Sequence, residues 1–246
     1  SFDLGGAETL GLVGESGCGK STTGRAILRL VDPTSGQVVI NGTDVAGLSR
    51  RAMRPIRQQA QMIFQDPYNA LNPRQTVGAI LASPFRIQKV DPPGGVKQAV
   101  RELMDRVGLN PEHVNRYPYE FSGGQRQRIG IARAIALRPK LIICDEVTSA
   151  LDPLVADGIL KLLLDLQARE NVAYLFITHD LATVRAIADK IAVMFKGEVV
   201  RYGQKSDVLA PPFDDYTDLL LSSVPEMELG WLEKVITSRK MESAGN

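Results

Sequence analysis

The sequence predicts an α/β protein whose main sheet is mostly parallel. From residue 122 to residue 195, helical spacings of apolar residues alternate with short apolar runs, which is the order of a parallel sheet covered by helices. Near the start, an apolar run leads through a glycine-rich loop into another helical pattern. Residues 72–121 show helical patterns and turn residues without a comparable strand, which indicates an inserted α-helical subdomain.

The individual elements follow from these periodicities. Apolar runs open the chain at residues 2–4 and 9–13, and Asn41-Gly42 closes a hairpin-like stretch that begins at residue 37. The strongest helix is expected at residues 96–109, where apolar residues share one face. The other strands are expected at residues 61–64, 140–144, 172–177, 191–195 and 198–202, the other helices at residues 20–31, 122–137, 153–169 and 181–188, and a short one at residues 231–236.

Composition excludes several classes of protein. With 44% hydrophobic and 23% charged residues, the chain can bury a sizeable core and is not intrinsically disordered. The 29 basic and 28 acidic residues nearly cancel, which argues against binding nucleic acid by bulk charge. No apolar run approaches the roughly 18–20 residues of a membrane-spanning helix. The cysteines, Cys18 and Cys144, show no metal-ligand spacing and fit a reducing compartment with packing roles.

A glycine-rich loop connects the strand at residues 9–13 to the helix that starts at Lys20. Its sequence fits the phosphate-loop pattern of glycine, four residues and then Gly-Lys-Ser, and its place between strand and helix disfavours an ordinary turn. Backbone N–H groups and the positive end of the helix are expected to bind phosphate, with Lys20 on the β- and γ-phosphates and Ser21 on Mg²⁺. The expected phosphate-binding residues are Gly14, Glu15, Ser16, Gly17, Cys18, Gly19, Lys20, Ser21 and Thr22.

Two carboxylates follow the apolar run at residues 141–144. Asp145 and Glu146 are expected at the edge of a parallel sheet where ligands bind. Asp145 suits the coordination of Mg²⁺, and Glu146 could orient and deprotonate an attacking water. In isolation such a pair is more often a helix cap or a solvated charge, but the phosphate loop in the same chain favours a catalytic role.

A further anion site is expected at the start of a helix, at residues Ser122, Gly123, Gly124 and Gln125. Ser122 can cap the helix, and the backbone N–H groups behind it are free to bind an anion. From these residues alone, an ordinary capped helix start is an equally good interpretation.

Taken in order, these motifs resemble those of the nucleotide-binding subunits of ATP-binding cassette (ABC) transporters. The phosphate loop, the Q-loop glutamine Gln65, the signature at residues 121–125, the Walker B strand ending at Asp145-Glu146, the D-loop at residues 149–152 and the switch histidine His179 all match. The resemblance implies a phosphate-loop NTPase (RecA-like) core with an N-terminal antiparallel β region. It divides the chain into core residues 1–71 and 122–224, a helical subdomain at 72–121 and a C-terminal tail at 225–246.

The family also implies roles for single residues. Gln65 would touch Mg²⁺ or the attacking water and report the nucleotide state to the helical subdomain, and His179 would hold the γ-phosphate and align Glu146. Ser122–Gln125 and Asp152 of one subunit would contact the ATP that the phosphate loop of another subunit holds. The adenine-stacking aromatic residue of the family would precede Ser1, so the adenine side is expected to be incomplete here.

Residues 61–74 and 216–225 further resemble the ATPases of oligopeptide and dipeptide importers, although Asp214-Asp215 replaces the usual His-Pro. This implies an ATP- and Mg²⁺-dependent motor at the cytoplasmic face of the inner membrane, soluble when isolated. Its expected partners are a second ABC ATPase subunit, a transmembrane permease and, indirectly, an extracytoplasmic solute-binding protein, without nucleic acid. The alternative is an ABC-type ATPase of a non-transport complex, either phosphonate lyase-like or one that remodels nucleic acid or ribosomes. A non-catalytic nucleotide-binding module is disfavoured because Lys20, Asp145, Glu146 and His179 are present.

Overall fold

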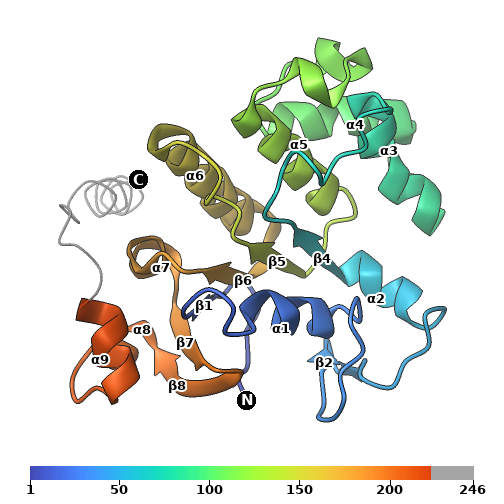
Figure 1. Cartoon of the computed structure of the whole chain (residues 1–246). Coiled ribbons are helices and arrows are strands. Elements are labelled where there is room, and N and C mark those ends of the chain that lie inside the picture. The colour runs from blue at the N-terminus through green and yellow to red at the C-terminus, as the bar shows by residue number, and fades with distance from the viewer. Residues whose placement is uncertain (223–246) are drawn as a thin grey trace, which may run out of the picture.

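The computed structural model describes residues 1–222, so the expected tail and its short helix at residues 231–236 lie outside the described residues. It confirms the predicted α/β fold with a mostly parallel sheet (Figure 1). The strands are β1 (Thr9–Val13), β2 (Val39–Ile40), β3 (Thr43–Asp44), β4 (Ala60–Ile63), β5 (Leu141–Asp145), β6 (Ala173–Thr178), β7 (Lys190–Phe195) and β8 (Glu198–Gln204). The helices are α1 (Lys20–Ile27), α2 (Met53–Gln59), α3 (Val77–Gln88), α4 (Gly95–Arg106), α5 (Gly123–Ile135), α6 (Pro153–Glu170), α7 (Leu181–Ile187), α8 (Lys205–Val208) and α9 (Asp215–Ser222), with 3₁₀ turns at Pro111–Asn115 and Pro118–Glu120.

The main sheet has six strands in the order β4-β5-β6-β1-β7-β8. All neighbouring pairs from β4 to β7 are parallel, and β8 pairs with β7 in the antiparallel direction. The carboxyl ends of β4, β5, β6 and β1 therefore lie side by side at one edge. β6 and β1 are neighbours in the sheet but are not consecutive in the chain, so the strand order changes direction between them. Open α/β sheets typically bind ligands at the carboxyl edge of such a switch point.

The two faces of the sheet are buried by different helices. On β5, Ile142 and Cys144 belong to the core that includes α3 to α6, whereas Ile143 belongs to the core that includes α2 and the end of α1. Ile142, Ile143 and Cys144 alternate between the two cores because successive side chains of a strand point to opposite faces of the sheet. Figure 1 shows α1 and α2 on one side of the sheet and α6 on the other. A strand covered on both faces reads as a continuous apolar run, which is the pattern of residues 141–144.

The N-terminal part differs from the expected elements in three places. Residues 2–4 form no strand, and Phe2 and Leu4 instead pack, partly buried, against the core. Helix α1 ends at Ile27, short of the expected residue 31. Arg29 has a φ of +53°, which is incompatible with a continuing helix. Helix α2 was not expected from the pattern, because Pro55 and the arginines of its short sequence hide the apolar positions Met53 and Ile56.

The small antiparallel sheet and the helical insertion follow the sequence more closely. Strands β2 and β3 pair through Asn41 and Gly42, whose positive φ values of 48° and 77° give the turn that this dipeptide favours. The described elements between Val77 and Glu120 are all helical, which agrees with the expected absence of strands there. Within residues 1–222, no helix combines the length and apolarity needed to cross a membrane.

Truncating the centre of the sheet should destabilise the protein strongly. Ile142 is 0% exposed on β5, between β4 and β6. Ile142→Ala is expected to lower the free energy of unfolding by about 2–5 kcal/mol, because it removes buried methyl groups and leaves a cavity. Val39→Ala is the control, because Val39 is 55% exposed and its truncation should stay within about 0.5 kcal/mol of wild type. Equal losses in urea-induced unfolding would contradict this packing.

Candidate active site

The phosphate loop joins β1 to α1, and its glycines adopt conformations that other residues rarely reach. Gly14, Gly17 and Gly19 have φ values of +154°, +81° and +107°. A Cβ atom at Gly14 would lie 2.1 Å from the backbone oxygen of Met194 on β7. The loop therefore depends on glycine both for its shape and for its close approach to the neighbouring strand.

Lys20 begins α1 and turns its side chain back into the loop. Its Nζ donates to the backbone oxygens of Gly14 and Glu15, each at 2.7 Å, and the residue is only 4% exposed. An ammonium group has three donors and no acceptor, so the loop's carbonyls are suitable partners for it. This contact places the positive charge at the centre of the phosphate loop.

Ser21 and Asp145 bring a hydroxyl and a carboxylate together beside the loop. The Ser21 hydroxyl donates to Oδ1 of Asp145 at 2.7 Å, and Asp145 is 1% exposed at the end of β5. Burial raises the pKa of Asp145, while the Ser21 hydrogen bond and the charge of Arg25 oppose that rise. Mg²⁺ prefers oxygen ligands of these kinds, so both side chains fit the expected metal role.

Glu146 meets Gln65 and His179 at the same edge of the sheet. Nε2 of Gln65 donates to Oε2 of Glu146 at 2.6 Å, and Nδ1 of His179 lies 3.4 Å from Oε1. Glu146 has a φ of +46°, which a non-glycine residue adopts at a cost of about 1–3 kcal/mol. Its backbone N–H donates to the oxygen of Ile177 at 2.9 Å, so the neighbouring strand holds this unfavourable conformation.

The strand order explains why these three side chains converge. Gln65 follows β4, Glu146 follows β5 and His179 follows β6, and these strands are consecutive in the sheet. The carboxyl ends of these strands are aligned, because Ile63 of β4 pairs with Cys144 of β5 and Asp145 of β5 pairs with Ile177 of β6. The phosphate loop follows β1, the next strand in the order. Residues more than eighty positions apart in sequence thus form one cluster.

The signature residues lie elsewhere in the structure. Ser122 caps α5, because its hydroxyl accepts from the Gln125 N–H while the Gln125 side chain accepts from the Ser122 N–H. A Cβ at Gly124 would lie 2.3 Å from Cγ1 of Val155, so the start of α5 packs directly on α6. Asp152 caps α6 by accepting from the Val155 N–H at 3.1 Å. Within residues 1–222, no hydrogen bond or ion pair joins these residues to residues 14–22.

Tyr68 connects the Gln65 segment to the signature helix, a role that the sequence did not reveal. The guanidinium of Arg126 on α5 lies 4.3 Å from the centroid of the Tyr68 ring. A Cβ at Gly123 would lie 3.3 Å from the Tyr68 hydroxyl. The available signal was the position of Tyr68 three residues after Gln65, but an exposed tyrosine in a loop has no pattern that identifies a partner.

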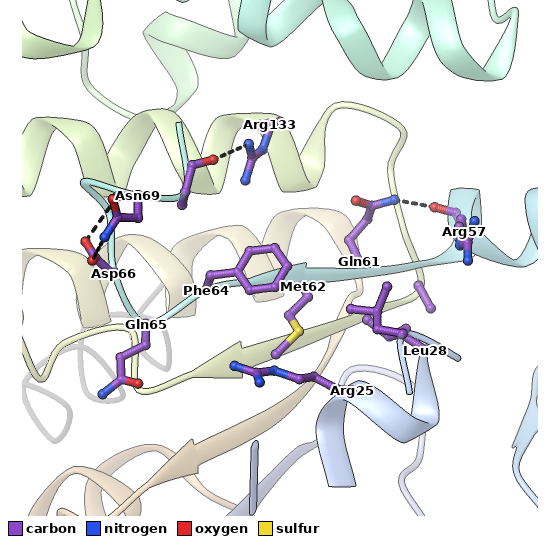
Figure 2. A pocket seen from close by; sticks show the side chains of 13 residues that line it. Arg25, Leu28, Arg57, Gln61, Met62, Phe64, Gln65, Asp66, Asn69 and Arg133 are labelled. Atoms are coloured by element: carbon purple, nitrogen blue, oxygen red, sulfur yellow. Dashed lines mark hydrogen bonds between the residues drawn. The ribbon is translucent and has the colours of Figure 1, made fainter. Parts of the chain in front are cut away.

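An open groove of about 610 Å³ is lined in part by Gln65 (Figure 2). Arg25 of α1 and Arg133 of α5 line it from opposite walls, and Phe64 lies between them. Arg133 is fixed by donating to the backbone oxygen of Ala70 at 2.7 Å. Since Gln65 both lines the groove and bonds Glu146, an occupant of the groove would touch the residue that contacts the carboxylate.

Both cysteines are buried and free, which agrees with packing roles. Cys144 precedes Asp145 on β5, and burial together with the charge of Asp145 raises the pKa of its thiol. A protonated thiol is a poor nucleophile. His113 lies in the first 3₁₀ turn with its ring 6.2 Å from that of Phe121 and takes no part in the cluster.

A strand, a phosphate loop and a helix, with carboxylates at the end of a nearby parallel strand, define a nucleotide-binding protein of the phosphate-loop class. The family can be stated more closely. Residues 1–149 match the model of the ABC transporter family, and the chain belongs to that family.

Similar curated proteins are described as glutathione import ATP-binding proteins GsiA. The protein from Salmonella paratyphi A is 52% identical over 225 residues, which cover 92% of this chain and 36% of that protein. The protein from Escherichia coli K12 is 51% identical over 228 residues, or 93% and 37% of the two chains. This chain therefore spans little more than a third of the length of these relatives.

Solved structures of ABC proteins share the fold. CbiO1 from Clostridium perfringens, part of the transporter complex cbiONQ, has a TM-score of 0.74 at 27% identity and matches 84% of this chain and 81% of its own. The dimeric cassette MJ0796, in a post-hydrolysis state with ADP and Pi, has a TM-score of 0.73 at 29% identity and matches 82% and 88%.

The contact between α5 and α6 gives a test of the signature helix. Gly124→Ala should lower the free energy of unfolding by about 1–3 kcal/mol, because its Cβ would clash with Val155. Gly130→Ala on the same helix is the control, since a Cβ there meets nothing within 4 Å and should stabilise by up to about 1 kcal/mol. Adding Val155→Ala to Gly124→Ala should recover part of the lost stability. If Gly124→Ala and Gly130→Ala change thermal and urea unfolding equally, the close contact between Gly124 and Val155 is refuted.

Proposed function

We propose that this chain is the ATP-binding and ATP-hydrolysing motor subunit of an ABC importer for peptides or related small solutes. It works as a dimer that sandwiches nucleotide and drives a membrane permease. The observation that carries the proposal is the Gln65–Glu146–His179 cluster, which lies at the same sheet edge as the phosphate loop. This is an arrangement for hydrolysis of the terminal phosphoanhydride bond of ATP rather than for binding alone.

The phosphate loop holds the nucleotide in this proposal. Its N–H groups and the start of α1 attract phosphate oxygens, and Lys20 supplies a fixed positive charge. Ser21 and Asp145 hold Mg²⁺, with Gln65 as a third candidate ligand. Bound Mg²⁺ would neutralise charge that develops on the phosphates.

Glu146 is the residue that activates water. The hydrogen bond from Gln65 and the proximity of His179 orient its carboxylate, and the positive φ at Glu146 fixes where the side chain starts. A carboxylate held in this way can position a water and accept its proton as the bond to the γ-phosphate breaks. His179, with 59% of its side chain exposed, remains accessible to the phosphate and to a facing subunit.

A second subunit completes the site. Ser122–Gln125 caps a helix on a different part of the chain from the phosphate loop and makes no bond to it, although its N–H groups suit an anion. The signature of one subunit therefore serves the nucleotide of another, as the family implies. Closure of such a dimer is driven by nucleotide because the ligand binds the closed state more tightly than the open one.

The groove beside Gln65 is the proposed contact with the permease. A segment that enters it would meet Phe64, Arg25 and Gln65 together. Gln65 would then transmit its displacement to Glu146 through a single hydrogen bond. The importer class is supported by the relatives, whose name specifies glutathione import, and glutathione is a tripeptide.

Replacing the proposed base tests the hydrolytic role directly. Glu146→Gln removes the proton acceptor but keeps the size of the side chain. We expect unchanged ATP affinity, a loss of turnover of about 10²–10⁴-fold, and a nucleotide-locked dimer visible by size-exclusion chromatography with light scattering. Lys20→Ala is the control that should lose nucleotide binding itself. Rapid hydrolysis by the glutamine variant would eliminate Glu146 as the base.

Partner capture separates an importer from an ATPase of a non-transport complex. From detergent-extracted membranes, the wild-type chain is expected to retain a polytopic membrane protein that mass spectrometry identifies. Arg57→Glu reverses a charge on the groove wall and should weaken this capture, whereas Arg74→Glu, at an exposed position outside the groove, should not. Retention of only cytosolic proteins, by wild type and both variants alike, would favour the non-transport class.

A further inference from the structure

Helix α9 reaches back to the phosphate loop through one tyrosine. The N–H of Glu15 donates to the hydroxyl oxygen of Tyr216 at 3.0 Å, across 201 positions of sequence. The Tyr216 ring packs on Phe195 at the end of β7, with centroids 4.2 Å apart and planes tilted by 32°. In the sequence, the segment beginning at Tyr216 shows only a family resemblance, and Tyr216 is not part of the Gln65–Glu146–His179 cluster.

The position of Tyr216 is fixed by the surrounding structure. Asp214 caps α9, because its carboxylate accepts from the Thr217 N–H at 2.8 Å and from the Thr217 hydroxyl at 2.6 Å. Thr217 is 1% exposed, and Leu220 packs on the core beside β7. The departure from His-Pro at residues 214–215 thus supplies a helix cap.

Arg201 holds the segment that leads into α9. Its guanidinium donates to the backbone oxygens of Asp207, Ala210 and Pro212 at 2.7–2.8 Å, and it lies 5.4 Å from the Phe213 ring centroid. Three carbonyls bonded to one rigid, planar guanidinium group leave this segment little freedom to shift. The segment before α9 therefore holds Tyr216 at a fixed position beside the phosphate loop.

Glu15 is held on both sides of its backbone. Its carbonyl oxygen accepts from Lys20 inside the loop, while its N–H is taken by Tyr216 outside. If Lys20 turns to bind phosphate, it gives up part of its hold on the loop carbonyls, whereas the Tyr216 bond need not change. The start of the loop then keeps its shape while nucleotide binds.

We propose that Tyr216 is a positioning residue for nucleotide binding, whose hydroxyl holds the first turn of the phosphate loop in the shape that accepts phosphate. The inference rests on the proposed ATP-binding function and assigns α9 a part in it. Without the Tyr216 hydroxyl, the Glu15 N–H donates to water instead, and the phosphate loop samples other conformations. The apparent affinity for ATP falls to the intrinsic affinity multiplied by the fraction of molecules whose loop remains competent. The chemical step is unchanged because Tyr216 touches none of the reacting groups.

Tyr216→Phe separates the hydroxyl from the ring, because phenylalanine keeps the packing on Phe195. In the full chain with Mg²⁺ and ATP, we expect the Kd and KM for ATP to rise about two- to tenfold, the range of one hydrogen bond. The kcat should stay within about twofold and the thermal midpoint close to wild type. In a ¹⁵N-labelled sample, exchange of the Glu15 amide with solvent should become faster.

Tyr119→Phe is the matched control, since it removes a phenol hydroxyl from a 65% exposed residue in the second 3₁₀ turn. It should leave the Kd, the KM, the kcat, the thermal midpoint and the Glu15 amide exchange unchanged. If Tyr216→Phe keeps wild-type affinity and Glu15 exchange while Tyr216→Ala lowers the thermal midpoint, Tyr216 only packs and the positioning role is wrong. If the wild-type chain binds no ATP, the proposed function itself fails. If the wild-type chain binds ATP and Tyr216→Phe binds it equally well, only the positioning role of Tyr216 fails.

Discussion

The candidate site depends on the parallel pairing of four neighbouring strands, β4, β5, β6 and β1. Each strand delivers one part of the site at its carboxyl end: Gln65, the Asp145–Glu146 pair, His179 and the phosphate loop. A slip of one residue in the β5–β6 register would turn Asp145 to the opposite face of the sheet. The buried alternation of Ile142, Ile143 and Cys144 prevents such a slip, so the same apolar residues that stabilise the fold also align the site.

Neutral hydrogen-bonding groups, rather than ion pairs, hold the charges of Lys20 and Asp145 in place. Lys20 is bonded to carbonyls and Asp145 to a hydroxyl, and both are nearly inaccessible to water. Charges held by neutral dipoles remain available to an incoming phosphate or metal, since they are not neutralised by an opposite charge. The pKa of Asp145 is raised by burial, and Ser21 and Arg25 counter this effect, which helps to keep the carboxylate ionised.

Sequence patterns predicted the fold class, the phosphate loop and the Asp145–Glu146 pair at the end of a strand, because strand periodicity and loop chemistry are local properties. Gln65 and His179 followed only from the resemblance to the ABC family. Sequence patterns did not predict α2, whose apolar residues are too few to give a clear period. They also missed Tyr68 on Arg126 and Tyr216 on Glu15, which join segments far apart in the chain. A partner across 201 positions leaves no trace in local spacing, so such contacts emerge only when the sheet order is known.

The close packing of α5 on α6 has an evolutionary consequence. Gly124 has no Cβ, and Val155 occupies the space where one would be. The cap residue Asp152 binds the N–H of the same valine, so the D-loop and the signature share one anchor. In related chains, the sizes of the residues at these two positions should therefore vary together: a larger residue at 124 is tolerated only with a smaller one at 155, even though each belongs to a different motif.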